Sequence, residues 1–109
     1  MHRCEIKPLS VNEAYMGRKR KTAKYRMYEA ELPMLLPEIE VPPRGDLGLR
    51  VTWGFSSSAS DLDNPLKPFL DILQTTYGFN DKRVHELIVH KVKTDKGDEF
   101  IEFDLYPLE

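Results

Sequence analysis

Apolar and polar residues alternate regularly in the middle of the chain. The apolar positions are Leu47, Leu49, Val51, Trp53 and Phe55, with Gly48, Arg50, Thr52 and Gly54 between them. This period of two is typical of a half-buried strand, so we predict one over residues 47–55. Residues 84–93 and 99–106 are predicted as two further strands joined by a turn at residues 95–98. Residues 3–9 are predicted as a short strand that Pro8 ends.

Two other segments have the spacing of helices. In residues 24–36 the apolar positions are Met27, Ala30, Leu32, Met34 and Leu35, and Pro33 is expected to kink the helix or end it early. Further along, Leu62, Leu66, Phe69, Leu70 and Leu73 have the spacing of one helix face. Pro65 suits a first turn, so this helix is expected to begin near Asn64, with its start distorted by Pro68. Residues 11–21 are expected to form a loop.

Together these elements predict a fold of the α/β or α+β class, in one domain over residues 1–109. A mixed sheet packed by two main helices accounts for the alternation of strands and helices. The chain contains no run of 18 apolar residues, so we expect no membrane-spanning helix and a cytoplasmic protein. Cys4 is the only cysteine, which excludes an internal disulfide and a Cys-rich zinc site.

The net charge of −2 conceals an uneven distribution. Residues 1–30 contain eight Lys and Arg against three acids, a balance of +5, whereas residues 31–109 contain eight against fifteen, a balance of −7. Six of the bases are clustered, namely Arg18, Lys19, Arg20, Lys21, Lys24 and Arg26. Such a cluster is typical of a surface that binds phosphate groups, so we predict that residues 16–26 bind phosphate. The alternative is a solvated basic loop.

The sequence Asp-Leu-Asp-Asn at residues 61–64 is the most informative for chemistry. Two carboxylates two residues apart point the same way on extended backbone but diverge by about 200° on a helix. Asp61 and Asp63 can therefore converge on one cation only if Asp61 precedes the helix, a condition that a helix start near Asn64 meets. The alternative is structural: Asp63 or Asn64 caps the helix, and Asp61 is a loop acid.

A third carboxylate and a lysine are candidates to complete this site, which spans the loop and helix at residues 56–76. Asp81 lies just before the strand predicted from residue 84; if that strand neighbours strand 47–55, Asp81 is expected at the sheet end where Asp61 lies. Mg²⁺ is usually held by one or two carboxylates together with substrate phosphate, so the acids predict Mg²⁺-dependent phosphoryl transfer. Lys67 would neutralise developing charge or position the attacking water; alternatively, it pairs with Asp63 or Asp71.

These residues belong to a pattern that extends over nearly the whole chain. It comprises Pro8-Leu9-Ser10-Val11-Asn12 with Tyr15, Tyr25-Arg26, Asp61-Leu62-Asp63-Asn64, Lys67-Pro68, Asp71, Leu73, and Asp81 with Val84. The pattern resembles the signature of RusA-type Holliday junction resolvases. Where that family has two adjacent acids in the late turn, this chain has Asn80-Asp81.

The resemblance implies a RusA-like fold and a homodimeric endonuclease that resolves four-way DNA junctions by paired nicks, with Mg²⁺, or Mn²⁺ in its place. It implies that Asp61, Asp63 and Asp81 bind the metal, that Lys67 acts in catalysis beside them, and that Asn12 and the basic segment contact DNA. It also implies the cytoplasm of a bacterial host, with a gene of bacterial, phage or prophage origin. The alternatives are a non-catalytic DNA-binding module and a nuclease for other branched DNA.

Overall fold

The strand β4 (Leu47–Phe55) is the central element of the sheet. The computed structural model describes residues 1–17 and 20–109, and it places β4 in a four-stranded sheet with β1 (His2–Cys4), β5 (Val84–Lys93) and β6 (Phe100–Pro107). The order across the sheet is β1-β6-β4-β5. β5 runs parallel to β4, whereas β6 is antiparallel to its neighbours β4 and β1. The sheet is therefore mixed, as predicted, although β5 and β6 flank β4 and do not pair with each other.

The structure confirms the predicted bounds of β4 and the buried face that its alternating sequence indicates. Its apolar side chains, Leu47, Leu49, Val51, Trp53 and Phe55, are all buried in the core. On the opposite face, Gly48 lies under the ring of Tyr106 and Gly54 lies under the ring of Phe100. A Cβ at either glycine would overlap the ring, so both positions depend on the absence of a side chain. β4 is thus covered on both faces, as suits a strand with neighbours on both sides.

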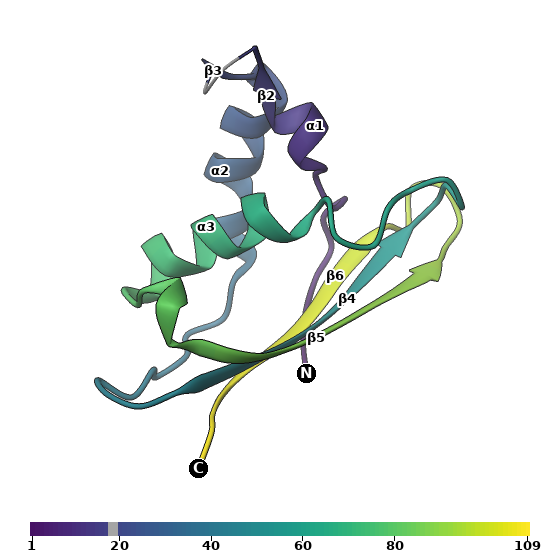
Figure 1. Cartoon of the computed structure of the whole chain (residues 1–109). Coiled ribbons are helices and arrows are strands. Elements are labelled where there is room, and N and C mark those ends of the chain that lie inside the picture. Colours follow the sequence, from purple (N-terminus) through teal and green to yellow (C-terminus); the bar gives the residue numbers. More distant parts are fainter. Residues whose placement is uncertain (18–19) are drawn as a thin grey trace.

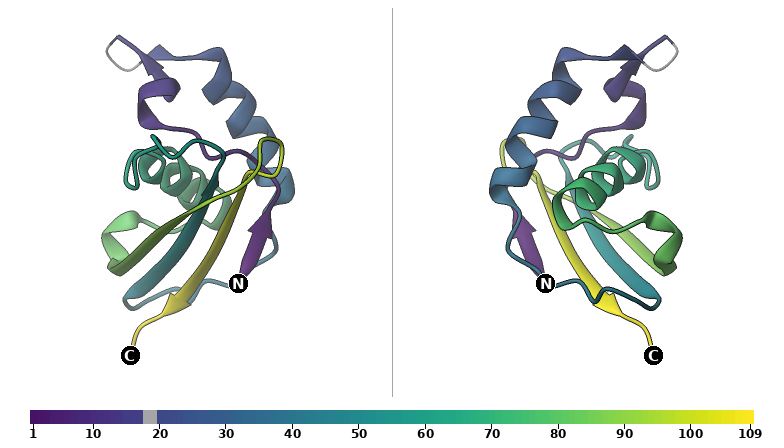
Figure 2. Two further views of the ribbon diagram at one scale, coloured as in Figure 1. Left: turned by 90° about the vertical axis from the view of Figure 1, so that its right-hand side faces the viewer. Right: turned by 90° about the vertical axis from the view of Figure 1, so that its left-hand side faces the viewer.

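The α-helices that the structure describes lie on one side of the sheet (Figures 1 and 2). They are α1 (Val11–Ala14), α2 (Ala23–Leu35) and α3 (Leu66–Tyr77), and the 3₁₀ turn η1 (Asp81–Arg83) follows α3. α3 leaves the end of β4 and leads back through η1 to the start of β5, which makes β4-α3-β5 a parallel crossover. The fold belongs to the α+β class, and none of the described helices is long and apolar enough to cross a membrane.

Both long helices contain a proline. Pro33 lies in the last turn of α2, which continues two residues further and ends at Leu35. Pro68 lies in the first turn of α3, where backbone N–H groups have no partner within the helix. α3 begins at Leu66, two residues later than expected, and Leu62 is therefore a loop residue with an exposed side chain.

The N-terminal region differs most from its prediction. The expected loop at residues 11–21 contains α1 and two short strands, β2 (Tyr15–Met16) and β3 (Arg20–Lys21), which pair antiparallel. Ser10 caps α1 by accepting a hydrogen bond from the backbone of Asn12. Thr22 caps α2, and its hydroxyl also donates to the carbonyl of Glu13 at 2.6 Å. These caps connect α1, the strand pair and α2 into one unit, which lies above the first turns of α3 (Figure 1).

Candidate active site

Hydrogen bonds from the sheet hold the segment between β4 and α3. The indole Nε1 of Trp53 donates to the carbonyl of Leu62 at 2.8 Å, and Nζ of Lys91 donates to the carbonyl of Ser60 at 2.6 Å. Trp53 is fully buried, so its N–H requires a partner inside the protein. Because these two carbonyls lie on either side of residue 61, the sheet positions the backbone that carries the first two candidate acids.

Asp61 and Asp63 both precede the helix, which is the condition for their convergence. Asp61 Oδ2 accepts a hydrogen bond from Asn64 Nδ2 at 2.7 Å, and the backbone N–H of Leu66 donates to the carbonyl of Asp63 at 3.0 Å. The N-cap of α3 is Pro65, and no side chain caps the helix. The alternative in which Asp63 or Asn64 serves as the cap is therefore wrong, and both carboxylates are exposed.

Lys67 lies in the first turn of α3 and pairs with Asp71, one turn further along. The distance from its Nζ to Asp71 Oδ2 is 3.1 Å. This hydrogen bond and the negative charge of Asp71 raise the pKa of Lys67 above its ordinary value, against a small opposing effect of burial. More distant contributions from Tyr15 and Asp81 act in the same direction. Of the two partners considered for Lys67, the structure selects Asp71, and the lysine is held in its charged form.

Asp81 lies at the other end of the sheet from Asp61, contrary to expectation. β4 and β5 are parallel, with Leu47 opposite Val84, so the turn before β5 lies beside the start of β4, whereas Asp61 follows its end. Within residues 1–17 and 20–109, no three His, Cys, Asp or Glu side chains are grouped so that they could hold a metal ion. The structure thus places Asp81 beside Gln74 in the last turn of α3, away from Asp61 and Asp63, and its role as a metal ligand stays a prediction.

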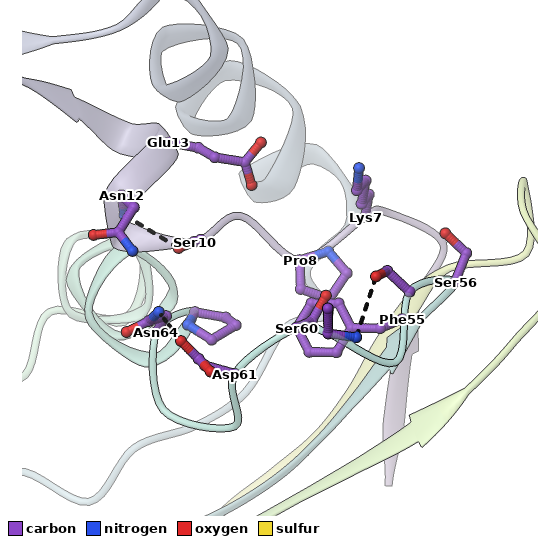
Figure 3. A pocket seen from close by; sticks show the side chains of 13 residues that line it. Lys7, Pro8, Ser10, Asn12, Glu13, Phe55, Ser56, Ser60, Asp61 and Asn64 are labelled. Carbon is purple, nitrogen blue, oxygen red and sulfur yellow. Dashed lines mark hydrogen bonds between the residues drawn. The ribbon is translucent and has the colours of Figure 1, made fainter.

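Asn12 joins the two parts of the site. The backbone N–H of Val11 donates to the carbonyl of Asn64 at 2.9 Å, which attaches α1 to the turn that carries the acids. The Asn12 side chain lies with Asp61 and Asn64 at a cavity of about 290 Å³ (Figure 3). It also lines a second, more open hollow with Lys67. Asn12 therefore lies between the candidate acids and the candidate lysine.

The comparison with known families decides the class of protein. The sequence model described as "Endodeoxyribonuclease RusA" matches residues 5–103 of the 109. The chain belongs to the RusA endodeoxyribonuclease family. The resemblance seen in the sequence is thereby confirmed, and the chain is a nuclease by class. No curated protein matches the chain closely enough to add a relative by name.

The basic residues of this RusA-family chain divide into paired and unpaired groups. Lys21 Nζ lies 2.8 Å from Glu29, and Lys24 Nζ lies 3.1 Å from Glu13. Arg20 and Arg26 are exposed and form no ion pair with a residue that the structure describes. Two further predicted DNA contacts, Arg18 and Lys19, lie outside the described residues.

A second hollow, of about 630 Å³, connects the basic strand pair to the candidate lysine. Its lining is made of Val11, Asn12, Tyr15, Gly17, Lys21 and Lys67. Lys21 and Lys67 thus face the same open space, although 46 positions separate them in the sequence. In this hollow of the RusA-family chain, a basic side chain from residues 16–26 lies near Asn12 and Lys67.

Two residues of the RusA-family site were missed by sequence reasoning. Trp53 appeared only as a core position of its strand, although a buried indole N–H needs an acceptor and so indicates a polar contact. Gln74 received no role, yet its side-chain carbonyl accepts a hydrogen bond from the backbone N–H of Asp81 at 2.9 Å. No pattern in the sequence reveals that contact, because it depends on the path of the chain after α3.

Proposed function

We propose that the chain is a Mg²⁺-dependent, structure-selective endodeoxyribonuclease that resolves four-way DNA junctions as a homodimer. The observation that carries the proposal is the turn at residues 61–65, which sets two exposed carboxylates before α3 and Lys67 in the first turn of the helix. Family membership supplies the nuclease class. Junction selectivity, the metal and the dimer are proposals that follow from the resemblance and the site.

The donor set at this turn fits Mg²⁺. Asp61 and Asp63 offer carboxylate oxygens at the surface, and no described basic side chain forms a salt bridge with either. Mg²⁺ usually keeps several waters and takes one or two protein carboxylates, with substrate phosphate completing its coordination. Asp61 and Asp63 are the proposed ligands on this basis. Asp81 is proposed as the third acid of the site from the family resemblance and because it is exposed, while the turn that carries it lies at the opposite end of the sheet from Asp61.

The side chains around the proposed Mg²⁺ site have different roles in phosphodiester hydrolysis. When bound, Mg²⁺ supplies a water of lowered pKa and polarises the phosphoryl oxygen. The ammonium group of Lys67, kept charged by Asp71, stabilises the negative charge that develops on the phosphate during attack. Asn12, at the boundary of the two hollows, is placed to donate its amide hydrogens to the DNA backbone. Two such sites, related by a two-fold axis, match a junction that has its own two-fold symmetry.

The decisive experiment compares three labelled DNA substrates. A four-way junction, a flap and a linear duplex of matched sequence are incubated with the full chain, with and without Mg²⁺. We expect symmetric paired nicks in the junction, only with the metal, and little cleavage of the duplex. Binding without nicking would instead support the non-catalytic module. Faster cleavage of the flap would support a nuclease for other branched DNA.

The binding of DNA by the basic segment is expected to depend steeply on salt. Substituting both Arg20 and Arg26 by Gln should make the slope of log K against log salt concentration less negative, by roughly 0.9 for each phosphate contact removed. Fluorescence anisotropy of the labelled junction between low and physiological salt measures this slope. Arg44→Gln is the matched control, because Arg44 is exposed and belongs to the connection between α2 and β4, a segment that lies away from the strand pair β2-β3 (Figure 1). An unchanged slope in the double variant would remove these arginines from the DNA surface.

A further inference from the structure

The exposed edge of α3 carries a continuous row of hydrogen-bonded polar side chains. Lys67, Asp71 and Gln74 are spaced four and three residues apart, so they share one face of the helix. Lys67 Nζ donates a hydrogen bond to Asp71 Oδ2. Gln74 Nε2 lies 3.5 Å from Asp71 Oδ1 and 3.4 Å from the carbonyl of Leu70. The carboxylate of Asp71 is thus approached by a donor on each oxygen.

Gln74 extends this row to the turn η1. Its Oε1 accepts a hydrogen bond from the backbone N–H of Asp81 at 2.9 Å. The first N–H groups of a short helix have no partner within it, and in η1 two of them receive side-chain acceptors. Gln74 Oε1 accepts from the N–H of Asp81, and Asn80 Oδ1 accepts from the N–H of Lys82 at 2.9 Å. The start of η1 is therefore fixed from α3 as well as from its own cap.

The chemistry of this position favours glutamine over its closest analogues. A carboxamide donates and accepts at the same time, whereas a carboxylate only accepts and a thioether does neither effectively. The Asp71 side requires a donor, and the Asp81 side requires an acceptor. Glutamate at position 74 would keep the bond to Asp81 but place a second negative charge beside Asp71.

We propose that Gln74 is a positioning residue that sets the place of Asp81 and couples it, through Asp71, to Lys67. The proposal rests on the proposed function, because the row of Lys67, Asp71 and Gln74 can affect cleavage in this way only if Asp81 and Lys67 act in cleavage. It goes beyond the candidate residues identified from the sequence, since neither Gln74 nor Asp71 was assigned a catalytic or metal-binding role.

Two substitutions at position 74 separate the two bonds of its side chain. Gln74→Met removes both, and Gln74→Glu retains the acceptor for Asp81. In Gln74→Met we expect the backbone amide of Asp81 to exchange with solvent about fivefold faster, as for the loss of one hydrogen bond. We also expect kcat for junction cleavage to fall by about ten- to a hundredfold with KM unchanged, as for residues that orient a metal ligand. Gln74→Glu should restore slow exchange and part of kcat.

The controls distinguish this proposal from the proposed function. Thr76→Ala changes an exposed residue of the same helix and should leave both measurements unaltered. Asp81→Asn, assayed in parallel, tests the acid itself: wild-type cleavage in this variant would contradict the role of Asp81, while the amide exchange would still report on Gln74. If Asp81→Asn is inactive but Gln74→Met cleaves normally, or if the Asp81 amide exchanges at the same rate in all variants, the positioning role is overturned.

Discussion

Substitution of Asp63 by Asn is expected to abolish Mg²⁺-dependent cleavage of a four-way junction while leaving junction binding intact or tighter. The substitution removes one of the two carboxylates proposed to bind the metal, so the loss should exceed the roughly hundredfold cost of removing a residue that only orients a ligand. Binding persists because the change also removes a negative charge that repels DNA phosphate. Single-turnover cleavage and an anisotropy titration with Ca²⁺ in place of Mg²⁺ measure the two effects separately.

Asp98→Asn is the matched control for this experiment. Asp98 is exposed in the turn between β5 and β6, so the substitution makes the same change of charge outside the candidate site. It should cleave at the rate of the unmodified chain. Retained Mg²⁺-dependent cleavage in Asp63→Asn would instead remove Asp63 from the metal site, and a parallel loss of junction binding would point to damage of the fold.

Trp53 is expected to be the largest single contributor to stability that also affects the site. Its ring is fully buried and meets Phe69 edge-on at 5.4 Å between centroids. Trp53→Ala should cost about 3–5 kcal/mol, a large part of the roughly 5–15 kcal/mol that stabilises a typical domain. Trp53→Phe keeps an aromatic ring but removes the donor to Leu62, so we expect a smaller loss of stability together with slower cleavage. Urea unfolding and single-turnover assays measure both quantities.

Phe103→Leu controls for loss of packing in this experiment. Phe103 is fully buried and also contacts Phe69, at 5.5 Å between centroids, but it makes no hydrogen bond to the loop of residues 56–65. We expect it to reduce stability without slowing cleavage at temperatures where the protein is folded. If Trp53→Phe and Phe103→Leu cleave at the same rate, the indole N–H has no part in holding the acids.

The sheet was predictable where the signal was local. Residues 47–55 and 84–93 match β4 and β5 residue for residue, because alternation marks the first strand and turns at both ends mark the second. The segment at residues 11–21 offered no such signal. α1 spans one turn and β2 and β3 two residues each, so none is long enough to show a period. They are stabilised by contacts from elsewhere, such as the bond from Val11 to Asn64.

The candidate site was predictable in part for the same reason. Pro65 indicated that Asp61 and Asp63 precede the helix, and the structure agrees. The position of Asp81 depends on the direction of β5 relative to β4 and not only on their adjacency; the helix predicted between the two strands already indicated a parallel pair. A strand that is parallel to its neighbour brings the turn before it to the opposite edge of the sheet from the loop that follows the neighbour. The pairing of Lys67 with Asp71 was one of two alternatives, and only the side-chain geometry distinguishes them.

The path of α3 across the sheet has a consequence for the scale of the DNA contact. Twelve helical residues span about 18 Å, and one strand of a duplex presents a phosphate about every 3.4 Å. A DNA duplex whose axis runs along α3 from Asp63 to Asp81 would therefore present about five phosphates of one strand over this length. The acids at its two ends would then face different nucleotides, so the protein would measure a length of strand rather than recognise a single point.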